Sequence, residues 1–105
     1  MDVVTVTPAE VLAAREAGSG ALILDVRTEE EWSSHHIPGA TLLPMHLLMS
    51  RMGELDPARE TIVVCEHGVR SMNVARYLVS QGFEQIKNMA GGMSEWAGPV
   101  EADDL

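Results

Sequence analysis

One stretch of the sequence, TIVVCEHGVRSMNVARYLVSQG, restricts the possible folds of this chain more than any other. It begins with a β-branched run at residues 62–64, which is typical of a buried strand. From Ser71 onward apolar residues recur at helical spacing, and Gly82 follows the last of them. We therefore expect a strand, a short loop at 65–70, and a helix over about 72–81 with Ser71 as its N-cap.

The loop between this strand and this helix begins with Cys65, the only cysteine of the chain. A short connection that turns into a helix N-terminus directs several backbone N–H groups toward one point, where the helix dipole adds partial positive charge. These groups favour a thiolate, whereas the neighbouring Glu66 opposes it. We give the amides the larger effect and predict that the pKa of Cys65 lies below that of a free cysteine.

Strand and helix signals alternate along the rest of the chain. Strands are expected at about 3–6, 21–26, 40–43 and 83–89, and helical segments at about 8–17, 29–36 and 45–55, with a brief one around Trp96. Capping boxes begin two of the helices, at Thr7 and at Thr28. This alternation predicts an α/β fold with a central parallel sheet of about five strands, helices on both faces, and a binding site at the carboxyl ends of the strands.

Length and charge limit the organisation and the partners of the chain. Its 105 residues predict a single domain over 1–105, with a core at about 4–97 and an acidic tail at about 98–105, whose last five residues, EADDL, are expected to fray. Acidic residues outnumber basic ones by 16 to 7, so nucleic acid and anionic membranes are not expected partners. The sequence shows neither an apolar run of membrane-spanning length nor a secretory signal, which predicts a cytoplasmic protein.

The sequence gives no sign of a metal or another cofactor, and none is expected. A single cysteine and four scattered histidines make a zinc site improbable, and neither His36 nor His46 has a companion at ligand spacing. Trp32 and Trp96 are interpreted as packing residues.

Two further patterns are interpreted as structural. Asp25 and Arg27 flank the end of a strand and Glu31 follows four residues later, which predicts an ion-pair network that braces the active-site face. Residues 45, 49 and 52 are methionines at helical spacing, which predicts a stripe facing the core. A soft lip for a protein partner is the alternative for these methionines.

The motifs together resemble the rhodanese-like domain family in its small single-domain form, over about residues 4–96. The landmarks are LDVR at 24–27 with Glu31 and Trp32, HIPGA at 36–40, CEHGVRS at 65–71, Gly82 and Phe83, and Gly91 and Gly92 with Trp96. The resemblance implies an α/β fold with a parallel sheet and an enzyme that passes sulfur through a cysteine persulfide. The chain departs from relatives at His35, where glycine is common, and at Glu66, in a variable position that bears on the substrate.

The resemblance implies a sulfurtransferase of the thiosulfate sulfurtransferase (rhodanese) type, with Cys65 as its catalytic residue. The implied substrate-binding residues are those of the loop: Glu66, His67, Gly68, Val69 and Arg70. The sulfur donor would be thiosulfate, a persulfide or a polysulfide, and the acceptor a thiol such as thioredoxin, glutathione or a sulfur-carrier protein.

Other interpretations of these residues remain open. Cys65 could be a small buried hydrophobe at a strand end, Arg70 could cap the loop or pair with a surface acid, and His67 could be an exposed residue without a role. The domain could be a non-enzymatic sulfur-carrier or sulfur-sensing module. A phosphatase-like enzyme is less favoured, because those enzymes place five residues between cysteine and arginine whereas four separate Cys65 from Arg70.

Overall fold

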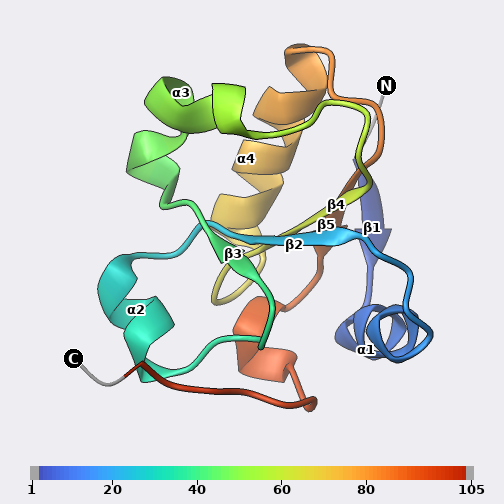
Figure 1. Ribbon diagram of the computed structural model, residues 1–105, viewed down its shortest axis with the longest axis vertical. Helices are drawn as coiled ribbons and strands as arrows, with labels where there is room; N and C mark the ends of the chain where they lie inside the picture. Colours follow the sequence, from blue (N-terminus) through green and yellow to red (C-terminus); the bar gives the residue numbers. More distant parts are fainter. Residues whose placement is uncertain (1–2, 104–105) are drawn as a thin grey trace.

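Five short strands form one parallel sheet in the computed structural model, which describes residues 3–103 (Figure 1). They are β1 (Val4–Val6), β2 (Leu22–Asp25), β3 (Thr41–Leu42), β4 (Thr61–Val64) and β5 (Ile86–Met89), in the order β1-β5-β4-β2-β3. Strand β4 lies in the centre of the sheet, between β5 and β2, and all four of its residues are buried. The predicted five-stranded α/β fold is therefore confirmed, and its central strand leads into the Cys65 loop.

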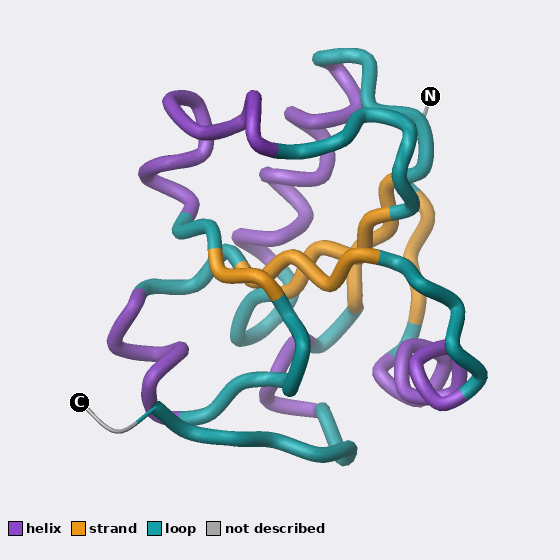
Figure 2. The backbone as a smooth tube through the Cα atoms, in the orientation of Figure 1, coloured by secondary structure: helices purple, strands orange, loops and turns teal. Residues whose placement is uncertain are grey.

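Helical segments cover both faces of the sheet (Figures 1 and 2). The α-helices are α1 (Pro8–Glu16), α2 (Glu29–Ser34), α3 (Leu48–Arg51) and α4 (Val69–Ser80), and the 3-10 turns are η1 (Met45–Leu47), η2 (Met52–Glu54) and η3 (Gly92–Glu95). In Figure 1, α3 and α4 lie above the sheet and α1 and η3 lie below it. None of the helices within residues 3–103 has the length and apolar character needed to cross a bilayer.

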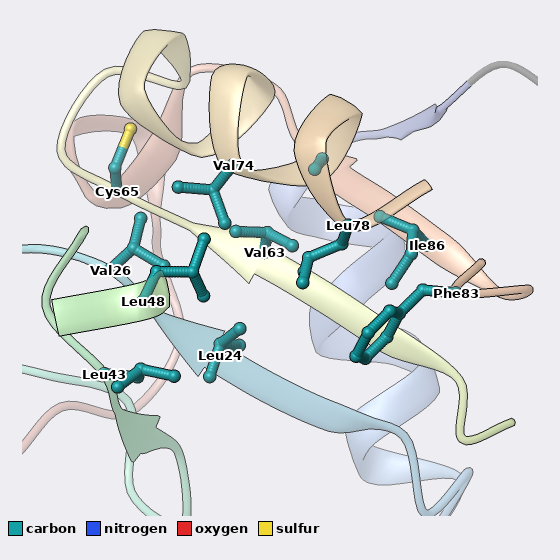
Figure 3. Close-up of a cluster of buried hydrophobic side chains, with 11 residues drawn as sticks. Leu24, Val26, Leu43, Leu48, Val63, Cys65, Val74, Leu78, Phe83 and Ile86 are labelled. Carbon is teal, nitrogen blue, oxygen red and sulfur yellow. The ribbon is translucent and has the colours of Figure 1, made fainter. Parts of the chain in front are cut away.

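The side chains of β4 alternate between two hydrophobic clusters. Ile62 and Val64 join the cluster that includes Val11 of α1, whereas Val63 joins the cluster beneath α4. Cys65 follows the strand and belongs to the same cluster as Val63. Figure 3 shows its sulfur at the end of that cluster, near the start of α4. Period-two alternation along a strand thus determines on which side of the sheet the sulfur lies.

Both capping boxes that the sequence predicts are present. The Thr7 hydroxyl accepts a hydrogen bond from Glu10 N at 3.1 Å, and the Glu10 carboxylate accepts one from Thr7 N at 2.9 Å. Thr28 and Glu31 form the same reciprocal pair at the start of α2, at 3.2 and 3.1 Å. The second box fixes Glu31 on the side of α2 that carries it toward the Cys65 loop.

Helix α4 begins earlier than the sequence indicates. Its first residue is Val69 rather than Met72, and its N-cap is Gly68 rather than Ser71. Gly68 has φ +91°, a left-handed conformation that costs glycine little and lets the chain turn abruptly into the helix. Ser71 therefore lies within the first turn of α4, fully buried, and its side chain is available for a contact with the sulfur.

The methionine segment differs from the predicted core-facing helix. It is divided into η1, α3 and η2, and Met45 and Met49 are 42% and 77% exposed. Leu48 is the buried residue of this segment, at 4% exposure. The prediction is wrong for Met45 and Met49 because tight 3-10 turns advance by three residues per turn, so side chains at 3.6-residue spacing no longer share one face.

The acidic tail contacts α2, so the expected fraying is wrong for residues 101–103. Glu101 forms an antiparallel bridge with His36, with both N···O distances at 2.9 Å. The Asp103 carboxylate accepts a hydrogen bond from the Trp32 indole at 2.9 Å, and the Trp32 ring stacks on His36 with centroids 3.7 Å apart. The tail is ordered there because its acceptors meet donors at Trp32 of α2 and at His36, which follows this helix. Residues 104 and 105 lie outside the described residues.

Candidate active site

Three polar groups of the loop and of α4 converge on the sulfur of Cys65. Gly68 N lies 3.0 Å from Sγ and Ser71 N lies 3.3 Å from it. The Ser71 hydroxyl is 3.2 Å from the same atom. Because both N–H groups donate to Sγ and the hydroxyl can do so, the site solvates a negatively charged sulfur without using a positively charged residue in direct contact.

These contacts lower the pKa of the Cys65 thiol, as the sequence predicts. Burial alone would raise this pKa, since it disfavours the charged form. Hydrogen bonds from the Ser71 hydroxyl and from the backbone N–H groups of Ser71, His67 and Gly68 outweigh the effect of burial. The thiolate form of Cys65, which is the nucleophilic form of a cysteine, is thereby favoured.

The backbone of the loop is held from below by η3. Met93 N donates to the Cys65 carbonyl at 2.8 Å and Ser94 N donates to the Glu66 carbonyl at 2.9 Å. A Cβ atom on Gly92 would lie 2.3 Å from the Cys65 carbonyl oxygen, closer than any real contact allows. Gly92 is therefore required for η3 to approach the loop, and the expected position of Gly91 and Gly92 near Cys65 is confirmed.

Asn88 of β5 holds the turn of the loop from the side. Its amide donates to the Gly68 carbonyl at 3.2 Å, while Gly68 N donates to Sγ. The side chain is 3% exposed, and its Oδ1 is buried without a hydrogen-bond partner among the described residues. Asn88 thus holds the Gly68–Val69 peptide, which adjoins the His67–Gly68 peptide whose N–H contacts the sulfur.

An ion-pair network lies beside the loop, as expected, although some of its pairs differ from those that the spacing of Asp25, Arg27 and Glu31 suggests. Arg27 is fully buried and binds the Asp25 carboxylate through Nε and Nη2, with Nη2 at 2.8 Å from Oδ2. Its Nη1 lies 3.3 Å from Glu66 Oε1. From the sequence, we expect the negative charge of Glu66 to disfavour the thiolate. Arg27 partly balances this charge.

Arg70 binds a carboxylate of α2. Its Nη1 and Nη2 donate to Oε1 and Oε2 of Glu31, both at 2.8 Å. This pairing lowers the pKa of Glu31 to about 2 and raises the pKa of Arg70. The structure therefore shows the surface-acid pairing that the sequence leaves open for Arg70, and Glu31 has Arg70 as its partner in place of Arg27.

The remaining loop side chains face outward. His67 is exposed, and Val69 is 69% exposed. A hollow of about 320 Å³ borders the loop, between α2 on one side and Arg27 and Glu66 on the other. The outward side chains and this hollow form the solvent-facing side of the loop.

Ser71 and Asn88 are site residues that the sequence analysis did not assign. Ser71 follows Cys65 by six residues and was expected only to cap a helix. Asn88 is a buried polar residue between Lys87 and the buried Met89 in β5, and a polar residue inside a predicted strand is the signal that could have identified it, because such a group needs a hydrogen-bond partner when it is buried. Among residues 3–103, no group of three or more histidine, cysteine, aspartate or glutamate side chains is placed to hold a metal ion.

Known proteins resemble this chain in sequence and in fold. Residues 7–99 match the family model of the rhodanese-like domain. The chain is 36% identical to the thiosulfate sulfurtransferase GlpE of Pseudomonas entomophila over 87% of its own length and 82% of that protein. It is 39% identical to the putative sulfur carrier protein YrkF of Bacillus subtilis, over 75% of this chain and 43% of that protein.

Solved structures give the same likeness. The crystal structure of a rhodanese-like domain protein from Staphylococcus aureus superposes with a TM-score of 0.90 at 30% sequence identity, covering 97% of this chain and 100% of that one. The likeness therefore extends over the whole described fold, including the strand, loop and helix around Cys65.

Proposed function

The chain belongs to the rhodanese-like domain family, and we propose that it is a sulfurtransferase in which Cys65 carries the transferred sulfur as a persulfide. The observation that supports this role most directly is the convergence of Gly68 N, Ser71 N and the Ser71 hydroxyl on one sulfur atom. These donors favour the anionic sulfur of the resting thiolate; in the persulfide the negative charge lies on the outer sulfur, which is bonded to the sulfur that they contact.

The proposed reaction has two steps that balance in atoms and charge. The Cys65 thiolate attacks the outer sulfur of thiosulfate, the S–S bond of the donor breaks with its electron pair on the departing sulfite, and a cysteine persulfide remains. A nucleophilic acceptor then attacks the outer sulfur of the persulfide and regenerates the thiolate. Persulfides and polysulfides are alternative donors, and thiols such as thioredoxin, glutathione or a sulfur-carrier protein are the proposed physiological acceptors.

The backbone and the side chains of the loop have different proposed roles in binding. The backbone N–H groups of Gly68 and Ser71 contact the reacting sulfur, while the side chains of His67 and Val69 lie at the surface where a donor arrives. Because Cys65 is only 1% exposed, a slim terminal sulfur reaches it more readily than a bulky group. Arg70 supplies positive charge close to the reacting centre.

A second candidate is a sulfur carrier that is loaded and unloaded by other proteins. The similarity to the putative sulfur carrier YrkF favours it. A carrier needs the same stabilised persulfide, so it shares the first half of the mechanism. It differs in that free thiosulfate does not load it and cyanide or small thiols do not unload it at a useful rate.

Intact-protein mass spectrometry tests the proposal. The wild type and Cys65→Ser are each incubated with thiosulfate and desalted, and their intact masses are measured. We expect the wild type alone to gain the mass of one sulfur atom, and cyanide to remove that mass and release thiocyanate. Multiple turnovers in a coupled assay with both substrates then identify an enzyme.

Two results would contradict the enzyme proposal. Gain of sulfur by Cys65→Ser would show that another group reacts. Failure of the wild type to gain sulfur from thiosulfate or from polysulfide would favour the carrier, which a persulfide-loaded partner protein would then have to load.

A further inference from the structure

We propose that Glu31 determines which sulfur donors this site accepts: by occupying the guanidinium of Arg70, it disfavours doubly charged donors such as thiosulfate relative to donors with one negative charge. This inference rests on the proposed sulfur transfer and adds a specificity residue to it. Glu31 is a positioning residue, since it acts through Arg70 rather than on the sulfur.

Glu31 occupies both Nη atoms of Arg70. Both Nη atoms donate to Glu31 at 2.8 Å, so the two-pronged edge that would bind an oxyanion is already filled by a carboxylate. Arg70 lies in the first turn of α4, directly before Ser71, whose N–H contacts the Cys65 sulfur. An oxyanion that approaches the sulfur therefore meets a guanidinium whose charge is already matched.

Glu31 is held in place by its own helix. Its Oε1 accepts hydrogen bonds from Thr28 N at 3.1 Å and from the Thr28 hydroxyl at 3.2 Å. The carboxylate is thus part of the capping box that begins α2, and it reaches Arg70 from a fixed position. A donor has to displace this carboxylate from Arg70 or share the guanidinium with it.

The pair is accessible to solutes. The side chains of Arg70 and Glu31 are 35% and 31% exposed, so water and small anions can compete for both partners. A donor that needs the charge of Arg70 therefore has to compete with Glu31 for it, and this competition weakens the binding of a dianion more than that of a monoanion, which depends less on the charge of Arg70. A fully buried pair would not exchange in this way.

Arg27, the other arginine that the structure pairs with a residue of the loop, does not provide a match for a second negative charge. Arg27 is fully buried and is bound by Asp25 and Glu66. The pairs around the loop bring together three carboxylates and two guanidinium groups, which leaves one unbalanced negative charge. A dianion is therefore less well matched at this entrance than a monoanion.

The test compares two donors that differ by one charge. Thiosulfate releases sulfite and methanethiosulfonate releases methanesulfinate when the Cys65 thiolate takes the outer sulfur, so a methyl group in one donor replaces an oxygen anion in the other. In Glu31→Gln we expect kcat/KM for thiosulfate to rise about two- to fivefold relative to kcat/KM for methanethiosulfonate, mainly through a lower KM. Glutamine can still accept the Thr28 N–H and keep the capping box.

Two further variants separate this effect from general changes in charge or stability. Glu30→Gln removes one charge from the same exposed helix and the same hollow, and Glu31→Asp keeps the charge at the site. Both are expected to keep the donor preference of the wild type. An equal change of preference in Glu30→Gln and Glu31→Gln, or no change in Glu31→Gln, overturns the inference, and thermal unfolding confirms that each variant is folded.

A binding measurement keeps the inference independent of turnover. Sulfate is used to protect Cys65 from alkylation by iodoacetamide, and Glu31→Gln should be half-protected at a two- to fivefold lower sulfate concentration than the wild type or Glu30→Gln. Equal protection of all three proteins contradicts the role of Glu31. Failure of sulfur transfer itself is seen separately, as the absence of a mass gain in the wild type.

Discussion

Two arginine–carboxylate pairs brace the same loop in very different surroundings. The side chains of Arg27 and Asp25 are 0% and 2% exposed, whereas those of Arg70 and Glu31 are 35% and 31% exposed. Both pairs have N···O distances of 2.8 Å. Distance alone therefore does not distinguish them, and exposure does.

The difference teaches which pair can take part in recognition. In the buried pair, removal of one partner leaves an unmatched charge away from water, so the pair has to stay closed. In the exposed pair, water and dissolved anions replace a lost partner at little cost. We interpret Arg27 with Asp25 as the scaffold of the loop and Arg70 with Glu31 as its exchangeable entrance.

The largest effect is expected when the buried pair is broken. Arg27→Leu leaves Asp25 buried without its guanidinium, and removes the donor to the His35 carbonyl at 2.8 Å. We expect a loss of about 3–5 kcal/mol in the free energy of unfolding, measured by urea denaturation. Arg70→Ala should cost about 1 kcal/mol or less in the same experiment.

A double variant shows whether the unmatched charge is the cause. In Asp25→Leu with Arg27→Leu both charges are gone, so the double variant should be more stable than Arg27→Leu alone. If it is less stable, packing or backbone contacts of Asp25 account for the loss instead of its charge. Equal losses in Arg27→Leu and Arg70→Ala would break the distinction between the two pairs.

The next largest effect is expected on the reactivity of Cys65. It compares the loss of a group in direct contact with the sulfur with the loss of a charge farther away. Ser71→Ala removes the hydroxyl 3.2 Å from Sγ, whereas Arg70→Ala removes a charge that is itself bound to Glu31. Loss of the hydroxyl raises the pKa of Cys65 and lowers the thiolate fraction, so alkylation by iodoacetamide near neutral pH should slow roughly tenfold. Arg70→Ala should slow alkylation less. A larger effect of Arg70→Ala would show that the pair of Arg70 and Glu31 influences the pKa of Cys65 more than the Ser71 hydroxyl does.

A smaller effect is expected from the dependence of the exposed pair on pH. Arg70 holds the pKa of Glu31 at about 2 in the folded protein, below its ordinary value of 4.5. Glu31 therefore stabilises the fold fully above about pH 4.5, and this contribution is lost as the pH falls toward 2. Since both side chains are about a third exposed, we expect a difference of about 1 kcal/mol between wild type and Glu31→Gln.

Urea titrations of both proteins at a series of pH values measure this difference. It should be constant near neutral pH and should shrink in acid. A difference that grows in acid has the wrong sign for a carboxylate with a lowered pKa, and would show that another group dominates.

The smallest effect is expected at a third pair, Arg51 with Glu54, which extends the comparison to the open surface. These side chains are 41% and 60% exposed and lie within one short segment. Arg51→Ala should leave the midpoint of urea unfolding unchanged, because water replaces Glu54 as the partner. A loss as large as that in Arg70→Ala would show that exposure does not rank these pairs.

Features that depend on neighbouring residues in the chain were predictable from the sequence. The capping boxes at Thr7 and Thr28 involve residues three apart, and the left-handed Gly82 ends α4 as expected. The strand before Cys65 was predictable as well, because a run of β-branched residues has few other stable environments. These elements define the fold and the position of the sulfur.

Features that depend on distant residues were not predictable from the sequence. Ser71 has the composition of an N-cap, yet its hydroxyl is used by Cys65. Asn88 reaches Gly68 only because β5 lies beside β4 in this register, and Arg70 meets Glu31 only after α2 and α4 are packed. Local patterns thus locate Cys65, the proposed nucleophile, while the groups that lower its pKa depend on how the elements come together.

The contacts of Trp32 with the tail provide an optical signal for the entrance of the site. Trp32 follows Glu31 directly, its indole donates to Asp103, and its ring stacks on His36. Displacement of the Glu31 carboxylate from Arg70 takes place one residue away from this indole, so it would alter these surroundings and change the emission of Trp32. With Trp96→Phe as the background, fluorescence could follow the opening of the entrance as anions are added, without an attached dye.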